Sequence, residues 1–592
     1  METDFCVIGG GLAGICAAIS AARNGARVVL VQDRSVLGGN ASSEVKMHVV
    51  GADCHGRRPG ARETGLLEEF RLEDAFRNPQ RVYPMWDLLL YEKVKSEPNI
   101  VLLLDSDCDG CTTETADGRV KIVSAHVTRN STEDKFDIQA RFFADCSGDG
   151  RLGFEAGAEF LCGREARSDF GEPLALPERD NKTLGNSILF TARKYDTPQP
   201  FIRPDWARPF EKREFKFRPI DDYGYGYWWL EWGGQLDTIK DLEPIRHECL
   251  RIALGVWDYV KNSGDHPGAA NYVLEWVGAI PGKRESRRFL GPHVLVEQDT
   301  MSGRTFEDQV AYGGWWLDLH PPEGVDAIDE RPCIQHHIPH LYGIPLRSLY
   351  SRNVSNLFFA GRNISATHVA FASTRVMGTC SVMGQAVGTA AAACLALPGE
   401  AIASSCSPGV LHRIQQTLLR DDAFLPGLRN EDPNDLARTA KCSASSAQDN
   451  HGADRVLTGV GRKIRPEWGP WAEVVPNHWE SQSLPAWLEL ELPAASLVSE
   501  IHLTFDSGLD RELILSPSDF CNKKGLRGAQ PELVEDYDIS ANGSVILSVR
   551  DNCLRKRVHR FGQPLNARRI RFDLLSARGV TTARVFEVRL YA

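Results

Sequence analysis

The stretch Gly9-Gly10-Gly11-Leu12-Ala13-Gly14 decides the fold of the first part of the chain. It follows a short apolar run, residues 5–8, and opens a segment whose apolar residues recur at helical spacing. A second apolar run, residues 28–31, comes next, and such runs are typical of buried parallel strands. Residues 5–32 are therefore predicted to form a strand, a helix and a second strand around a G-x-G-x-x-G turn.

The motif glycines have separate purposes in a turn that binds a dinucleotide. Gly9 permits the tight turn, Gly11 lets a pyrophosphate approach the backbone, and Gly14 lets the helix pack closely on the strand. The helix N-terminus offers unpaired N–H groups to the phosphates. The acidic residue that usually ends the second strand is replaced by glutamine. Predicted contacts are Gly9, Gly11, Leu12, Ala13, Gly14, Gln32, Asp33 and Arg34. A glycine-rich turn without a ligand is the alternative.

A glycine pair in Leu37-Gly38-Gly39-Asn40 favours FAD over NAD. In flavoproteins with two dinucleotide-binding domains, such a pair follows the second strand and runs toward the flavin. The sequence resembles the FAD-dependent oxidoreductase family, distantly related to the fumarate reductase and succinate dehydrogenase flavoproteins. The resemblance implies an α/β fold with a Rossmann-like FAD-binding domain, FAD as the cofactor, and contacts from Gly38, Gly39 and Asn40. Covalent FAD on a histidine near the glycine pair is typical of succinate dehydrogenase relatives, but His48 lies eight residues past Asn40 in different surroundings, so non-covalent FAD is expected.

Two further segments carry the same resemblance. Residues 142–150 resemble a second FAD motif, in which an apolar strand ends in a glycine turn. Residues 356–363 resemble the strand that returns beneath the flavin, although Arg362 stands where the family usually has an acid. A helix then begins near Gly378, and its N-terminus would stabilise a reduced flavin. The cofactor contacts implied here are Ser147, Gly148, Gly361, Arg362, Asn363, Gly378 and Thr379.

Four residues are candidates for catalysis. The resemblance places His368 beside the flavin, where an imidazole can take a hydroxyl proton as hydride leaves. Arg375 could hold an anionic substrate or the reduced flavin. Arg284 belongs to a basic cluster near substrate or cofactor, and His48 is a secondary acid–base candidate. A structural hydrogen bond or ion pair is the alternative for each.

Thiols and histidines give little support for other chemistry. Cys108 and Cys111 form a C-x-x-C pair, but their strand-like surroundings do not suit a redox pair, which needs a helix N-terminus. The histidines within residues 336–340 lack the spacing of a known metal motif, so no metal is predicted. Fifteen cysteines, an odd count, indicate reduced thiols rather than a disulfide framework.

The first 400 residues are predicted to form one FAD-binding domain interrupted by an insertion. Its two parts are residues 1–154 and 341–400, and residues 155–340 form an inserted α+β substrate cap. The cap is rich in aromatic residues, notably within 223–229, and aromatic faces suit sugar rings or aromatic substrates. Strands also favour aromatic residues, so a purely structural core is the alternative.

The C-terminal part has a different pattern. Residues 401–450 read as a helical segment and linker, and residues 451–592 read as short strands, with apolar and charged residues alternating in 487–492 and 583–590. This predicts an all-β sandwich. The stretch is similar to galactose-binding-like sandwiches, which hints at glycan contact; a docking or dimerisation module is the alternative.

Charge and composition exclude some functions. The formal net charge of −11 argues against a nucleic-acid partner. No apolar segment is long enough for a transmembrane helix, and the start of the sequence lacks the features of a signal peptide. We therefore expect a cytoplasmic protein without a membrane partner. The electron partner is unknown, and a homo-oligomer is left open.

The sequence thus predicts an FAD-dependent oxidoreductase that transfers a hydride between flavin N5 and a small polar, carbohydrate-like substrate. Two alternatives remain. One is a flavin-dependent reductase of a C=C bond in an organic acid. The other is a glycan-binding protein whose flavin domain is inactive.

Overall fold

The computed structural model describes residues 1–116, 118–397, 402–467, 473–523 and 525–592. The predicted boundary at residues 400–401 lies outside the described residues. The chain divides into two compact units. Unit 1 comprises Met1–Gly51, Arg81–Leu411 and Ile514–Lys524, and unit 2 comprises Ala52–Gln80, His412–Leu513 and Gly525–Ala592.

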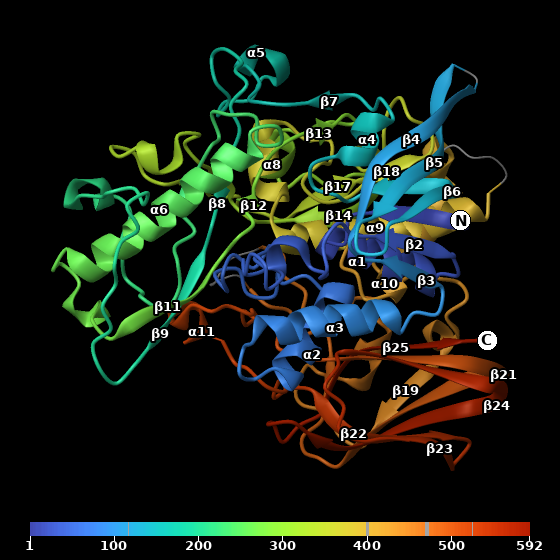
Figure 1. The fold of residues 1–592 in the computed structure, drawn as a ribbon. Helices are drawn as coiled ribbons and strands as arrows, with labels where there is room; N and C mark the ends of the chain where they lie inside the picture. Colours follow the sequence, from blue (N-terminus) through green and yellow to red (C-terminus); the bar gives the residue numbers. More distant parts are fainter. Residues whose placement is uncertain (117, 398–401, 468–472, 524) are drawn as a thin grey trace. The chain divides into compact units, whose positions relative to one another are not determined.

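Unit 1 is built on a seven-stranded mixed sheet (Figure 1). Its strands are β1 (Glu2–Ile8), β2 (Val28–Val31), β3 (Ile100–Leu103), β4 (Ser106–Ala116), β5 (Arg119–Arg129), β6 (Asp134–Asp145) and β18 (Leu357–Phe359). The order is β3-β2-β1-β6-β5-β4, with β18 paired to β6. The strands β3, β2, β1, β6 and β18 run parallel, as in a Rossmann-like domain, while β5 pairs antiparallel with both β6 and β4. The predicted strand–helix–strand unit is confirmed.

Two helices of this domain pack unusually closely. They are α1 (Leu12–Arg23) and α9 (Met377–Leu395). A Cβ added to Gly384 would lie 2.0 Å from the Ala13 carbonyl oxygen, and one added to Gly388 would lie 2.2 Å from that of Ala17. Only glycine therefore allows this contact. It joins the first and last segments of the domain, which are far apart in the chain.

The inserted region consists of short strands and helices between the two parts of this domain. Its elements are β7 (Phe160–Leu161), α5 (Arg167–Phe170), β8 (Asn186–Ser187), β9 (Phe190–Lys194), β10 (Glu231–Trp232), α6 (Leu242–Asn262), β11 (Tyr272–Val277), β12 (Gly282–Lys283), β13 (Arg288–Phe289), α7 (Glu297–Met301), β14 (Gln309–Gly313), β15 (Leu317–Leu319), β16 (Ile334–His336) and β17 (Tyr342–Pro345). Tyr227, Trp229 and Trp257 are buried in one apolar cluster, with Tyr227 and Trp229 stacked at 4.8 Å. Much of the aromatic run therefore serves as core.

The remaining helices of unit 1 are α3 (Tyr83–Lys95), α4 (Arg151–Glu155), α8 (His368–Thr374) and α11 (Asp519–Asn522), while α10 (Pro408–Arg420) contains the change from unit 1 to unit 2. No helix among the described residues is long and apolar enough to cross a membrane.

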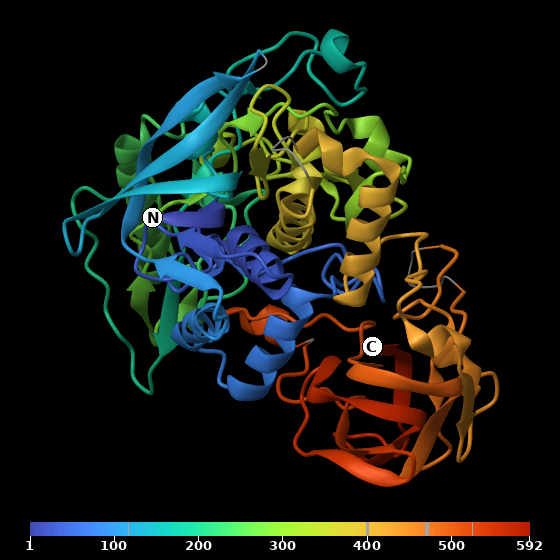
Figure 2. The ribbon, with the colours of Figure 1, turned by 90° about the vertical axis from the view of Figure 1, so that its right-hand side faces the viewer.

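Unit 2 is an all-β sandwich with one helix in its core (Figure 2, orange to red strands). Its elements are α2 (Leu66–Arg77), β19 (Lys441–Ala444), β20 (Trp479–Glu480), β21 (Ala486–Phe505), β22 (Val534–Ala541), β23 (Ser544–Val549), β24 (Lys556–Ala577) and β25 (Arg584–Tyr591). The long strand β21 pairs with β24 along most of its length, and also with β19 and β25. The predicted sandwich is confirmed.

Residues 52–80 belong to unit 2, a placement that the sequence analysis does not anticipate. Leu72 and Ala75 of α2 are buried in the sandwich core. Arg62 is fully buried; its guanidinium lies 2.7 Å from Glu68 and donates to the backbone carbonyl of Gly508. A buried charge needs such partners, so these bonds fix the segment in the sandwich.

Candidate functional site

The glycine turn after β1 has the geometry that a dinucleotide requires. Gly9 has φ +106°, and a Cβ there would lie 2.4 Å from the Cys146 carbonyl oxygen. A Cβ on Gly14 would lie 1.8 Å from the Gly9 oxygen. A Cβ on Gly11, by contrast, would meet no atom within 4 Å. The turn is therefore tight at its two ends and open at Gly11, where a pyrophosphate would approach.

Gln32 holds this turn from inside the protein. Its Oε1 accepts a 2.6 Å hydrogen bond from the Gly10 N–H, and its Nε2 donates to the Val36 carbonyl at 3.1 Å. Gly38 N–H also donates to the Gly10 carbonyl, at 2.9 Å. Both ends of the buried Gln32 amide are thus used within the protein. Its neighbour Asp33, the other residue predicted at this strand end, is exposed.

The second predicted motif forms a hydrogen-bonded cluster around Asp145 at the end of β6. The fully buried Asp145 accepts bonds from Ser147 Oγ at 2.7 Å and from the Gly153 N–H at 2.9 Å. Asn363, just after β18, donates to the Asp145 carboxylate at 3.1 Å. Burial raises the pKa of Asp145. These hydrogen bonds connect the second and third motifs. The sequence predicts each motif but not the contact between them.

Arg362 stands in a setting that suits phosphate. A Cβ added to Gly148 would lie 2.6 Å from its Nη2, so glycine is required there. Nη2 reaches Asp149 Oδ1 at 3.5 Å, while Nη1 is buried and has no hydrogen-bond partner in the structure. The buried Asn363 Oδ1 and Thr379 Oγ1 also lack partners. Buried polar atoms without partners are rare, and a dinucleotide would satisfy them. The residues present therefore fit FAD.

Gly378 is already engaged by the protein. Its N–H donates to the Val50 carbonyl at 2.9 Å. Of the two residues predicted at the start of α9, Thr379 is thus the one with an unused polar atom.

His368 begins helix α8 and is held by a carboxylate from the inserted region. Its Nδ1 lies 3.0 Å from the carboxylate of Glu285, which is fully buried. Its backbone N–H donates to Glu165 Oε2 at 2.8 Å. No hydrogen bond to Nε2 is found among the described residues. An imidazole fixed at Nδ1 presents Nε2 as the proton acceptor.

Buried Arg288 supports this arrangement. Its guanidinium lies 3.1 Å from Glu285 and 2.9 Å from Glu165, the two carboxylates that hold His368. Burial disfavours the charged carboxylate, but His368 and Arg288 outweigh it and lower the pKa of Glu285. Glu285 therefore stays ionised beside Nδ1 of His368.

A second histidine centre lies in the inserted region. His320 Nδ1 is 2.7 Å from Glu231, and its Nε2 is 3.0 Å from Asp318. Arg375 Nη2 is 3.1 Å from Asp318 and 3.0 Å from His320 Nε2, while Arg284 Nη1 is 3.5 Å from Glu231. Both predicted arginines are thus brought to one centre, whose three other members the sequence analysis missed.

Charge pairing fixes the protonation of this centre. Burial opposes ionisation, but Arg284 and His320 outweigh it and lower the pKa of Glu231 to about 2. In the same way, Glu231 and Asp318 overcome burial and raise the pKa of His320. His320 is therefore an imidazolium between two carboxylates.

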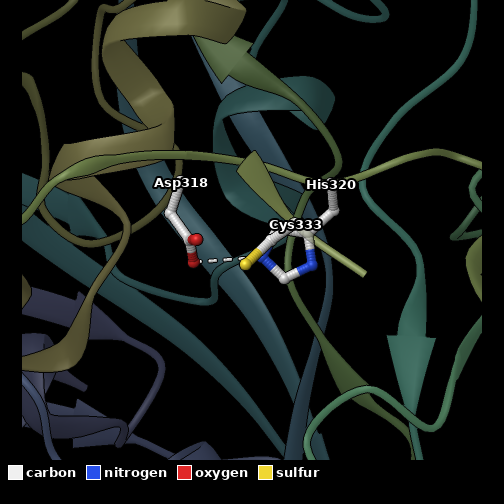
Figure 3. A group of neighbouring side chains, drawn as sticks. All are labelled: Asp318, His320 and Cys333. Atoms are coloured by element: carbon white, nitrogen blue, oxygen red, sulfur yellow. Dashed lines mark hydrogen bonds and ion pairs between the residues drawn. The ribbon is translucent and has the colours of Figure 1, made fainter. Parts of the chain in front are cut away.

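Cys333 completes a group that could in principle hold a metal. Figure 3 shows its thiol turned toward Asp318 and His320. The ligand atoms of the three lie within 4.8 Å of one another. However, Arg375 already contacts both Asp318 and His320, so a positive charge occupies this position. Burial and Asp318 also raise the pKa of the Cys333 thiol, which disfavours the thiolate that a metal needs.

The remaining candidates are His48 and the cysteine pair. The His48 ring is 6.4 Å from that of Tyr225. Cys108 and Cys111 lie on strand β4 without a disulfide, and burial raises their thiol pKa values to about 12 and about 11. They are therefore unreactive thiols.

Comparison with known proteins now assigns the family. The model of the FAD dependent oxidoreductase family matches residues 4–399, and the chain belongs to this family. FAD is therefore its cofactor, and the enzyme is an FAD-dependent oxidoreductase. No curated protein matches the chain.

Solved structures are similar only at the level of part of the fold. The family 32 carbohydrate-binding module of C. perfringens NanJ, in complex with galactose, is 18% identical, with 27% of this chain and 98% of that chain covered and a TM-score of 0.19. Another Clostridium perfringens module, CpGH89CBM32-5 in complex with GalNAc-β-1,3-galactose, is 15% identical, covering 27% and 99%, with a TM-score of 0.19. Thermovibrio ammonificans THI4 is 17% identical, covering 28% and 66%, with a TM-score of 0.21. At these values the likeness carries no inference about ligand or activity.

Proposed function

We propose that the enzyme oxidises a carbinol group of a small, neutral, polar substrate of the carbohydrate kind, with His368 as the base. Bound FAD supplies the two-electron acceptor, which takes the hydride at N5. The carbinol carbon loses that hydride, and His368 Nε2 takes the hydroxyl proton as the carbonyl forms. The proton and the electron pair are thereby both accounted for.

The single observation that supports this proposal is the His368–Glu285 pair. The 3.0 Å contact at Nδ1 orients the ring, and Glu285 compensates the positive charge that develops when Nε2 takes a proton. The ion pairs of Arg288 with Glu285 and Glu165 keep the pair in place. The base is therefore preorganised by groups that themselves are buried.

A neutral substrate is favoured because the two arginines are engaged internally. Arg284 donates to Ser187 Oγ at 2.8 Å and to the Trp228 carbonyl at 2.7 Å, besides its contact with Glu231. Arg375 is paired with Asp318. A dicarboxylate would need such guanidinium groups free. This argues against the organic-acid reductase.

For the cofactor, we propose non-covalent binding by the glycine turn, the Gly38–Gly39 pair and Arg362, with residues 155–340 as the substrate cap. A cytoplasmic location is supported by the absence of any disulfide among the fifteen cysteines, all of which the structure describes. Acid precipitation tests the binding mode: all flavin should appear in the supernatant.

Anaerobic flavin reduction tests the activity. Sugars, polyols and organic acids are added singly to the oxidised holoenzyme, and the flavin absorbance is followed. We expect bleaching by at least one sugar or polyol, and its loss in His368→Asn but not in His340→Asn, which changes an exposed histidine.

Two results would contradict the proposal. Reoxidation of the reduced enzyme by unsaturated acids alone would establish the reductase direction. Glycan binding by a protein whose flavin responds to no donor would establish an inactive flavin domain.

A further inference from the structure

A second group of metal-ligating side chains lies within unit 2. It consists of His451, His478 and Glu480, called here the His451 cluster, whose ligand atoms all lie within 4.8 Å of one another. The oxidoreductase chemistry proposed above uses none of these residues. Two imidazoles and one carboxylate form a donor set that suits zinc and related transition metals.

Glu480 is oriented by its neighbours. Its Oε1 accepts a 2.9 Å bond from Thr582 Oγ1 and a 3.0 Å bond from Arg584 Nε. Its other oxygen, Oε2, faces His478 Nε2 at 3.4 Å. The two donors thus fix the carboxylate through one oxygen and leave the other toward the histidines. Metal-binding carboxylates are held in this way by outer partners.

The buried His478 ring makes only a long contact with Glu480 through its Nε2. The side chain is only 4% exposed, and no side-chain contact of Nε2 other than that with Glu480 is found among the described residues. The 3.4 Å from Nε2 to Glu480 exceeds the length of a good hydrogen bond. It is close to the roughly 3.3 Å that separates two ligands of a tetrahedral ion with bonds of ~2.0–2.1 Å.

His451 is the third proposed ligand, and a hydrogen bond at Nδ1 orients its ring. Its ring lies 4.3 Å from that of His478, centre to centre. Its Nδ1 is 3.3 Å from the His478 backbone carbonyl, which can only accept, so Nδ1 carries the proton and Nε2 keeps a lone pair.

The cluster differs from the Asp318 group in one decisive respect. Arg375 contacts two of the three members of that group, Asp318 and His320. In the His451 cluster, the only arginine recorded as a hydrogen-bond partner among the described residues, Arg584, binds Oε1 of Glu480 on the outer side. No hydrogen bond from an arginine to either imidazole is found among the described residues, in contrast to the contact of Arg375 with His320.

We propose that His451, His478 and Glu480 bind one divalent transition-metal ion of the zinc class, with a fourth position for water or another ligand. Three protein ligands with one open position form a common zinc arrangement. The site belongs to unit 2 and is independent of the flavin chemistry.

Zinc retention by the full-length holoenzyme tests the proposal. The protein is treated with EDTA, incubated with zinc chloride and desalted, and zinc and flavin are measured in the same sample. We expect about one zinc per chain in the wild type. His451→Gln and Glu480→Gln should lose most of it, while His412→Gln, at an exposed position of unit 2, should retain it. Cobalt in place of zinc should give the visible absorption of a four-coordinate ion, absent in His451→Gln.

Folding and flavin content provide the controls. Each variant should keep the wild-type circular dichroism and flavin ratio before metal is added. The proposal is overturned if the wild type retains no zinc, or if folded His451→Gln and Glu480→Gln retain as much as His412→Gln. It is equally overturned if Cys333→Ser, and not His451→Gln, abolishes retention, because the Asp318 group would then be the site.

Discussion

His368 and His320 are both buried histidines of unit 1, and both contact carboxylates from distant parts of the chain. They differ in the number of carboxylates. His368 has one, at Nδ1, whereas His320 has Glu231 at Nδ1 and Asp318 at Nε2. One partner orients an imidazole and leaves it able to take a proton. Two partners hold an imidazolium that has no free nitrogen. The surroundings, and not the residue type, separate a base from a structural cation.

The largest effect is expected from removing the base. His368→Asn should lower the rate of flavin reduction by about 10²–10⁴-fold, because general-base catalysis contributes on that order. Anaerobic stopped-flow absorbance with the best sugar or polyol measures it. Flavin content and the unfolding temperature should not change. A loss below about tenfold would show that another group takes the proton.

Removing the structural cation should instead affect stability. His320→Asn removes the imidazolium between Glu231 and Asp318 and leaves each carboxylate with one arginine, Arg284 or Arg375, so we expect a loss of up to about 3 kcal/mol, the cost of breaking a buried ion pair. Urea unfolding followed by flavin fluorescence measures the loss, with His340→Asn as the matched control. If His320→Asn is as stable as this control while flavin reduction collapses, the two histidines have been assigned the wrong way round.

The orienting carboxylate should have an intermediate effect. Glu285→Gln keeps the size of the side chain but removes the charge that faces protonated His368. We expect the rate constant of flavin reduction to fall about ten- to a hundredfold, or ~1.4–2.7 kcal/mol. Substrate affinity should be nearly unchanged, and Glu285→Asp should restore part of the rate. A purely structural role would weaken substrate and flavin binding together with the rate, which separates the two explanations.

The smallest expected effect is a loss of folding stability at acidic pH. Burial opposes ionisation, but Arg284 and His320 lower the pKa of Glu231 from its ordinary 4.5 to about 2. Its contribution is therefore full above pH 4.5 and is lost as the pH falls through about 2. Between pH 6 and pH 4 the loss is about 1 kcal/mol. Urea unfolding at both values should show this loss in the wild type and not in Glu231→Gln.

The contribution of His320 to stability depends on pH in the opposite direction. Because the pKa of His320 is raised in the folded protein, its contribution to stability is full below about pH 6.5, the ordinary pKa of a histidine. The contribution disappears as the pH rises through the pKa in the folded state. A wild type whose stability increases from pH 6 toward pH 4 would contradict the assignment of Glu231, and one whose stability increases as the pH rises above 6.5 would contradict that of His320.

The glycine turn could be predicted because its requirements are local. Gly9, Gly11 and Gly14 occur in one short stretch, and backbone sterics alone dictate them. Gln32 shows the limit of such reasoning. The sequence placed it at the end of the second strand, but only the structure shows that both ends of its amide bond to the loop.

The histidine centres could not be predicted as units, because their members are brought together by the insertion. His368 and Glu285 are separated by 83 positions, and His320 and Glu231 by 89. The basic run at residues 283–288 was a signal, and it contains Glu285, but the sequence analysis singled out Arg284. His320 carried no signal at all.

The division of the chain into two units has a consequence for biosynthesis. Unit 2 needs residues 52–80 together with residues 412–513 and 525–592, and the FAD-binding domain of unit 1 needs α1 together with α9. A ribosome delivers the chain from the N-terminus at roughly 5–20 residues per second. Neither unit can therefore complete its core while the insertion is being made. During that interval the apolar faces of α1 and α2 stay exposed, because their partners have not been synthesised. The nascent chain therefore needs protection from aggregation for longer than a chain of consecutive domains would.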